Sequence, residues 1–156
     1  MGRWVFKRKD GKCIISMIEN DLFKEYKAYM QAKSIFASKL NIFNATPNSL
    51  AEFPTIIMRQ MNESDYIQGK TTDRLEYVSR LNYRVSIYAK PIVISNTKYQ
   101  PRQIIDELRK LTSDFFRNMG LDKDSDRPVD NIDLSISRQE MIFSGRLASW
   151  NNSLYF

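Results

Sequence analysis

The most regular pattern of apolar and polar residues lies between residues 77 and 89. Apolar side chains occupy alternate positions there, and Arg80 and Arg84 lie between them. A period of two is typical of a β-strand with one buried face. We therefore predict a long strand with an apolar face toward the core and an arginine-bearing face away from it. Pro91 ends this strand, and residues 92–94 continue as a brief edge segment.

Two segments repeat their apolar residues every three or four positions, as a helix with one buried side does. The clearer one spans residues 101–119, with Pro101 at the first helical position and Gly120 as the stop. The other spans residues 21–39, after an Asn-Asp pair that can cap its start. We predict a helix over each segment.

The rest of the chain alternates between β-prone runs and loops. The β-prone runs are residues 55–61, 132–136, 141–150 and a last short strand at 154–156. The expected loops are residues 41–54, the turn-like segment 62–73 and the acidic stretch 122–130.

The first residues predict a separate element. Asp10-Gly11 is favoured in a two-residue type I′ turn and lies between β-prone runs at 4–6 and 13–15. We predict a β-hairpin arm over residues 1–17, followed by one domain over residues 18–156. The alternative is that the segment is dispensable, or that translation starts at the next methionine.

In order, the elements are hairpin, α, β, β, α, β, β. We predict an α+β fold, a two-layer domain with a mainly antiparallel sheet, two helices on one face, and the N-terminal hairpin arm. The 156 residues are the length of one domain.

Composition excludes several classes of protein. The chain has no histidine, the commonest acid-base group near neutral pH and a frequent ligand of catalytic metals. A single cysteine allows no intrachain disulfide and fits a reducing compartment. We find no run that could span a membrane or act as a signal peptide, and therefore expect a soluble protein made inside the cell.

Two polar motifs match known ligand sites only in part. Asp122, Asp124 and Asp126 have the spacing that begins a calcium loop, but the glycine and final glutamate of that loop are missing. Residues 69–72, Gly-Lys-Thr-Thr, match the end of a phosphate loop, but Ser64 stands where the pattern needs glycine. We expect solvated loops at both places, no enzyme and no cofactor.

The net charge of +6 is uneven along the chain. Residues 1–12 carry +4, and the rest of the chain carries +2. We therefore expect the arm to contact an acidic neighbour. The candidate contact residues are Arg3, Trp4, Lys7, Arg8, Lys9 and Lys12.

Arginines recur in the predicted strands, at Arg59, Arg80, Arg84, Arg138 and Arg146. With both helices on one face of the sheet, the face that bears Arg80 and Arg84 would be open. One interpretation is a solvated polar surface. The other is a face that a second subunit covers, or that lines a channel for a polyanion, because arginine is favoured at interfaces and against phosphate.

The order of several motifs resembles a known family. These are Phe53-Pro54-Thr55-Ile56-Ile57 leading to Asn62-Glu63-Ser64-Asp65, the strand Tyr83-Arg84-Val85-Ser86-Ile87-Tyr88-Ala89, Ile104-Ile105-Asp106 in a helix ending at Met119-Gly120, and Ile136-Ser137-Arg138-Gln139-Glu140-Met141-Ile142-Phe143-Ser144-Gly145. Over residues 18–150, the chain is similar to the tail terminator and tail completion proteins of long-tailed bacteriophages, on the plan of the lambda tail terminator.

This resemblance implies a virion protein of the tail or neck, assembled in the host cytoplasm as a hexameric ring on the end of the tail tube. Such a ring stops tube growth, docks on the head connector and passes double-stranded DNA without reading its sequence. It implies no enzyme, cofactor or membrane. The basic arm departs from the family plan, and we expect it to reach a neighbouring subunit or a connector protein.

Two alternatives stay open. One is a head-completion or stopper protein in the same neck of the virion. The other is a nucleic-acid-binding module, in which tyrosines and arginines of residues 77–88 would contact bases and phosphates. Against this module, the body carries only +2, and most of those tyrosines fall on the predicted core face.

Overall fold

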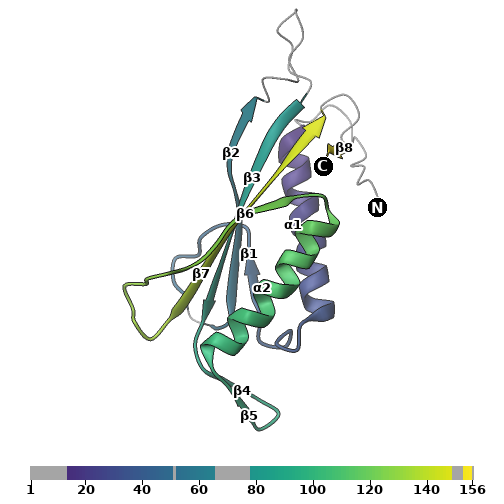
Figure 1. Cartoon of the computed structure of the whole chain (residues 1–156). Helices are drawn as coiled ribbons and strands as arrows, with labels where there is room; N and C mark the ends of the chain where they lie inside the picture. The colour runs from purple at the N-terminus through teal and green to yellow at the C-terminus, as the bar shows by residue number, and fades with distance from the viewer. Residues whose placement is uncertain (1–13, 51, 66–77, 149–152, 156) are drawn as a thin grey trace, which may run out of the picture.

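Figure 1 shows the computed structural model, which describes residues 14–50, 52–65, 78–148 and 153–155. Within these residues the chain forms two helices, a mainly antiparallel sheet and a separate two-stranded sheet, so the predicted α+β class is confirmed. The helices are α1 (Ile14–Lys33) and α2 (Pro101–Asn118). The strands are β1 (Asn41–Phe43), β2 (Thr55–Asp65), β3 (Val78–Ala89), β4 (Ile92–Ile94), β5 (Thr97–Tyr99), β6 (Asp122–Val129), β7 (Ser137–Ala148) and β8 (Ser153–Tyr155).

The main sheet has the strand order β1, β2, β3, β7, β6, and β8 pairs with the C-terminal end of β7. Strands β1 and β2 run parallel, whereas the other neighbouring pairs are antiparallel. One row of paired residues crosses β1, β2, β3, β7 and β6 near one end of the sheet, and we call it the end row. It consists of Asn41, Thr55, Tyr88, Arg138 and Val129.

Both helices lie on one face of this sheet (Figure 1). Val85 and Ile87 of β3 are fully buried beneath them, and Phe116 of α2 stacks on Phe143 of β7 with 4.3 Å between ring centroids. Arg84, which lies between the buried Tyr83 and Val85, is exposed. The predicted faces of the long strand are therefore confirmed over residues 83–89, whereas the side chains of residues 78–81, Arg80 among them, lie outside the description. The second predicted helix is confirmed as well.

Helix α1 begins earlier than predicted. Ile14 and Ile15 are helical, so the predicted second strand of the hairpin is wrong at these two positions. In the sequence, Ile18 and Leu22 follow Ile15 at helical spacing, and this longer pattern prevails over the short β-prone run. The rest of the predicted hairpin, within residues 1–13, lies outside the described residues.

The C-terminal end of α1 also differs from the prediction. The helix stops at Lys33 instead of residue 39. The Ser34 hydroxyl oxygen accepts a hydrogen bond from the backbone N–H of Phe36 at 3.1 Å, and the Phe36 side chain is buried. A local bond of this kind competes with the helical pattern and turns the chain toward the core.

All three predicted loops contain strand residues. Within residues 41–54 lies β1, where the Ile42 side chain is buried beside β2. The predicted acidic loop forms β6, whose charged residues and Pro128 suit the edge of a sheet, where one side of the backbone needs no partner strand. Strand β2 continues to Asp65, past its predicted end at Met61.

The opposite error occurs just before β7. Residues 132–136, predicted as a strand, form a loop. The Asp133 carboxylate accepts hydrogen bonds from the backbone N–H of Ser135 at 2.9 Å and from its hydroxyl at 2.7 Å. This local turn, and not burial of alternate side chains, determines the backbone here, and Ile132 and Leu134 are both exposed.

A small hairpin of β4 and β5 leads into α2. Its two turn residues, Ser95 and Asn96, have φ angles of 49° and 64°, the left-handed values that a type I′ turn needs at both central positions. Residues 92–94 were predicted as an edge segment, but β5 was missed. At the start of α2, the Gln103 side chain accepts the backbone N–H of Gln100 at 2.9 Å.

Asp126 joins the edge strand β6 to helix α2. Its carboxylate accepts hydrogen bonds from Arg109 at 2.8 Å, from Lys123 at 3.3 Å and from the Gln139 side chain. Burial acts to raise the pKa of this carboxyl, but the three hydrogen bonds outweigh burial and hold the pKa below its ordinary value.

We expect Asp126→Asn to lower the free energy of unfolding by roughly 1–2 kcal/mol at pH 7. The folded-state pKa lies below the unfolded value of about 4, so this stabilisation is present above pH 4 and is lost as the pH falls through the folded pKa. Urea denaturation from pH 7 to pH 3 should show that the difference in free energy of unfolding between Asp126→Asn and the unaltered protein becomes smaller in acid. Asp122→Asn, exposed on the same strand, is the control, and a gap independent of pH would contradict the prediction.

Candidate functional site

The face of the main sheet opposite the helices carries charged side chains from four strands. The register places Arg59 of β2 directly opposite Arg84 of β3, and Arg127 of β6 opposite Glu140 of β7. Neither of the two described helices lies on this side (Figure 1). We call it the arginine face and define it by Arg59, Arg84, Arg127, Arg138, Tyr88 and Glu140.

Arg59 and Arg84 place two positive charges side by side. Both side chains are exposed, and together with Gln60 and Met61 they line an open hollow of about 280 Å³. Like charges directly opposite each other on adjacent strands destabilise a sheet. An anion bound between the two guanidinium groups would remove that repulsion, so the pair favours a negatively charged partner.

Glu140 is a buried carboxylate on this otherwise basic face, with 7% of its surface exposed. One oxygen accepts a hydrogen bond from Arg138 at 3.2 Å, and the other lies 3.8 Å from the Arg84 Nε. The Arg138 guanidinium carbon also lies 5.3 Å from the centroid of the Tyr88 ring, within the range of a cation–π contact. Glu140 and Tyr88 therefore fix the position of Arg138, and Glu140 also lies near the more exposed Arg84.

We expect Glu140→Gln to lower the free energy of unfolding by about 1–3 kcal/mol. The amide keeps the shape of the side chain but leaves the Arg138 charge, whose side chain is 25% exposed, without its carboxylate. The more exposed Arg84 contributes little to the loss. Urea denaturation measures this loss. The same measurement on Arg138→Met and on the double variant completes a double-mutant cycle. Strictly additive losses would mean that the two side chains are not coupled.

The structure brings together three of the five arginines predicted from the sequence. Arg59 and Arg84 are cross-strand neighbours, and the carboxylate beside Arg84 links it to Arg138. Arg80 and Arg146 pair with each other in the register of β3 and β7, and their side chains lie outside the description. The arm residues Arg3, Trp4, Lys7, Arg8, Lys9 and Lys12 also lie outside the described residues.

Sequence reasoning missed Arg127 and Glu140. Arg127 falls in the segment that we predicted as an acidic loop, and the predicted strand began after Glu140, at Met141. One signal was available, because Arg138 and Glu140 are two residues apart and a strand places such residues on the same face.

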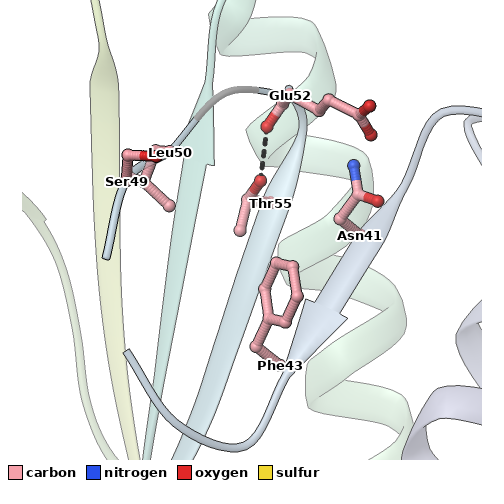
Figure 2. A pocket seen from close by; sticks show the side chains of 6 residues that line it. All are labelled: Asn41, Phe43, Ser49, Leu50, Glu52 and Thr55. Carbon is pink, nitrogen blue, oxygen red and sulfur yellow. Dashed lines mark hydrogen bonds between the residues drawn. The ribbon is translucent and has the colours of Figure 1, made fainter. Parts of the chain in front are cut away.

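A second hollow lies at the β1 edge of the main sheet, and we call it the edge pocket (Figure 2). It has a volume of about 150 Å³ and is lined by Asn41, Phe43, Ser49, Leu50, Glu52 and Thr55. Phe43 and Leu50 contribute apolar walls. The Thr55 hydroxyl donates a hydrogen bond to the Glu52 carbonyl, which holds the end of the preceding loop against the start of β2.

Other ionisable groups serve the fold. The Tyr26 hydroxyl in α1 shares a hydrogen bond of 2.8 Å with Thr112 in α2, and burial raises the pKa of this tyrosine. Glu107 of α2 accepts the backbone N–H of Ile35 at 3.2 Å, and burial raises its pKa as well. These contacts fix α1 and the turn after it against α2.

In the described parts of the chain, no group of three or more His, Cys, Asp or Glu side chains is placed to hold a metal. Residues 69–72 lie outside those parts. None of the helices described is long and apolar enough to cross a membrane. The two sites present guanidinium groups on one surface and, on another, a small pocket with two apolar and four polar lining residues.

The sequence matches no family model and no curated protein with which it was compared. The function must therefore be argued from the two surfaces themselves.

Proposed function

We propose that this protein is a structural subunit of a bacteriophage tail, which assembles as a ring on the end of the tail tube, terminates the tube and joins it to the head connector. The observation that carries the proposal is the arginine face. It is a sheet surface that neither described helix covers, with four arginines and one carboxylate in fixed register.

The composition of this face suits contact with a polyanion. Arg59 stands opposite Arg84, and because like charges so placed in general destabilise a sheet, the pair favours a negatively charged partner. Guanidinium groups bind phosphate oxygens with good geometry, and phosphate contacts carry no sequence information. In the proposed ring, the arginine face lines the lumen and meets the backbone of the passing double-stranded DNA.

The remainder of the surface suits assembly. Ile132 and Leu134, on the loop between β6 and β7, are almost wholly exposed, and Val93 on the β4–β5 hairpin is 52% exposed. Ile132 and Leu134 lie two residues apart on one loop, and neighbouring exposed apolar side chains are a candidate contact surface for another protein. The order of motifs resembles that of tail terminators and tail completion proteins. This resemblance is the reason for proposing a phage tail ring and not another kind of assembly.

The test is the mass of the purified protein, measured alone and after mixing with tail tubes of its phage, together with negative-stain images. The proposal expects a closed ring, hexameric as in the resembled family, either in solution or on the tube ends. A strict monomer under both conditions would overturn it. A ring that binds the head connector but never the tube would assign the protein to the stopper position instead.

Binding of DNA by a monomer would favour the nucleic-acid-binding module. That module predicts a salt-dependent affinity that falls when residues 1–12 are deleted. The ring proposal predicts that DNA contact depends on assembly, so a variant that cannot assemble should lose it even with the basic arm intact.

A further inference from the structure

The loop between β6 and β7 presents two apolar side chains to solvent. Ile132 and Leu134 are 104% and 91% exposed, more than any other large apolar residue of the described chain. We call residues 131–136 the apolar loop. In Figure 1 it is the turn between the arrows of β6 and β7, away from both helices.

The apolar loop is held in one shape. Asp133 accepts two hydrogen bonds from Ser135, and its backbone carbonyl accepts the N–H of Ile136 at 3.1 Å. The Asp133 carboxylate also lies 4.0 Å from the Lys90 ammonium, just beyond the end of β3. The exposed apolar side chains therefore project from a braced turn, so little backbone entropy is lost when they bind.

The edge pocket has the size and the walls to receive one of these side chains. Its volume is about 150 Å³ (Figure 2). Phe43, which is 40% exposed, and Leu50 form its apolar walls, and its other lining residues, Asn41, Ser49, Glu52 and Thr55, are polar. A cavity of roughly this volume holds a benzene molecule, which is comparable in size to a leucine or isoleucine side chain.

The loop and the pocket lie at the same level of the sheet, on opposite edges. The end row begins at Asn41, which lines the pocket, passes through Thr55, which also lines it, and ends at Arg138 and Val129, which flank the apolar loop. Two copies placed side by side, with their sheets at one level, would bring the loop of one copy to the pocket of the next.

We propose that neighbouring subunits contact each other head to tail, with the apolar loop of one copy seated in the edge pocket of the next. The occupant is a second copy of this chain. Two different surfaces on one molecule give a heterologous contact, which closes into a ring or continues as a filament. The inference rests on the proposed ring and names the surfaces that build it.

Cysteine cross-linking tests which surfaces meet. In a Cys13→Ser background, which removes the single native cysteine, the variant Leu134→Cys with Ser49→Cys should give a ladder of disulfide-linked multimers on oxidation. Leu134→Cys alone should give no cross-link, and Leu134→Cys paired with Lys110→Cys on the exposed side of α2 should give none. Dimers from Leu134→Cys alone would mean that like loops meet, and would overturn the head-to-tail contact.

Removal of the apolar side chain tests how much it contributes to the free energy of subunit association. Leu134→Ser should weaken subunit association by at least about tenfold, measured by sedimentation across a concentration series, without moving the melting temperature of the subunit. Val93→Ser is the matched control, because it removes an exposed apolar side chain from the other hairpin. An equal effect of both variants would overturn the inference.

The two proposals can fail separately. A ring by mass and microscopy that gives no ladder from the Leu134→Cys, Ser49→Cys variant overturns this contact and leaves the ring in place. A monomer that stays monomeric on tail tubes overturns both.

Discussion

Replacing Phe116 by alanine is expected to lower the free energy of unfolding by about 3–5 kcal/mol. The Phe116 ring is fully buried where α2 meets the sheet. It stacks on Phe143 of β7 at 4.3 Å between centroids and packs against Tyr26 of α1 at 5.7 Å and Tyr83 of β3 at 6.4 Å. One side chain thus joins both helices to the two central strands, and its removal leaves a cavity that none of these elements can fill alone.

Urea denaturation at pH 7 measures this loss. Leu134→Ala is the matched control, because it truncates a large apolar side chain that is 91% exposed, and it should change the free energy of unfolding by less than about 0.5 kcal/mol in the monomer. A loss below about 1 kcal/mol for Phe116→Ala would contradict the packing of α2 on β3 and β7.

The sequence predicts the elements that build this core well. Strand β3 alternates because Tyr83, Val85, Ile87 and Ala89 on one of its faces are buried, and α2 has both a proline start and a long apolar stripe. In these elements the apolar or polar character of each residue matches whether its side chain is buried. Their positions therefore follow from the sequence without knowledge of their neighbours.

The elements at the sheet edge depend on neighbours instead. Strand β6 is polar on both faces and is a strand because β7 supplies its hydrogen-bond partners, so the sequence Asp122–Val129 alone resembles a loop. Ile132 and Leu134 alternate like strand residues, but the Asp133 carboxylate, which accepts the backbone N–H of Ser135 two residues further on, decides the backbone conformation. Long-range pairing and local hydrogen bonds are the two influences that a hydropathy pattern does not contain.

In the candidate site, too, some features follow from the residues themselves and others depend on neighbouring strands. That arginines would occupy a face opposite the helices could be predicted from the period of β3. That Arg59 would stand opposite Arg84, and that Glu140 would lie between Arg84 and Arg138, depends on the register of three strands. A shift of one residue would move every side chain of a strand to the other face, and the sequence specifies that register only through the complete core.

Arg59→Glu is expected to move stability and function in opposite directions. The change puts a carboxylate opposite Arg84 in place of a second positive charge, so the free energy of unfolding should rise by about 0.2–1 kcal/mol. The assembled protein should at the same time bind double-stranded DNA more weakly. The slope of log K against log salt should fall in magnitude by at least about one, since a phosphate contact is lost.

Arg102→Glu is the matched control for this experiment, because it makes the same change of charge at an exposed position of α2, on the helical side of the sheet. It should leave the salt slope of DNA binding near that of the unaltered protein. If the two variants weaken DNA binding equally, net charge and not the arginine face governs the contact. If Arg59→Glu instead lowers stability, the repulsion between Arg59 and Arg84 is already relieved within the subunit, and the face has no need of an external anion. A gain in stability with a loss of DNA binding is the result that only a face arranged for a polyanion explains.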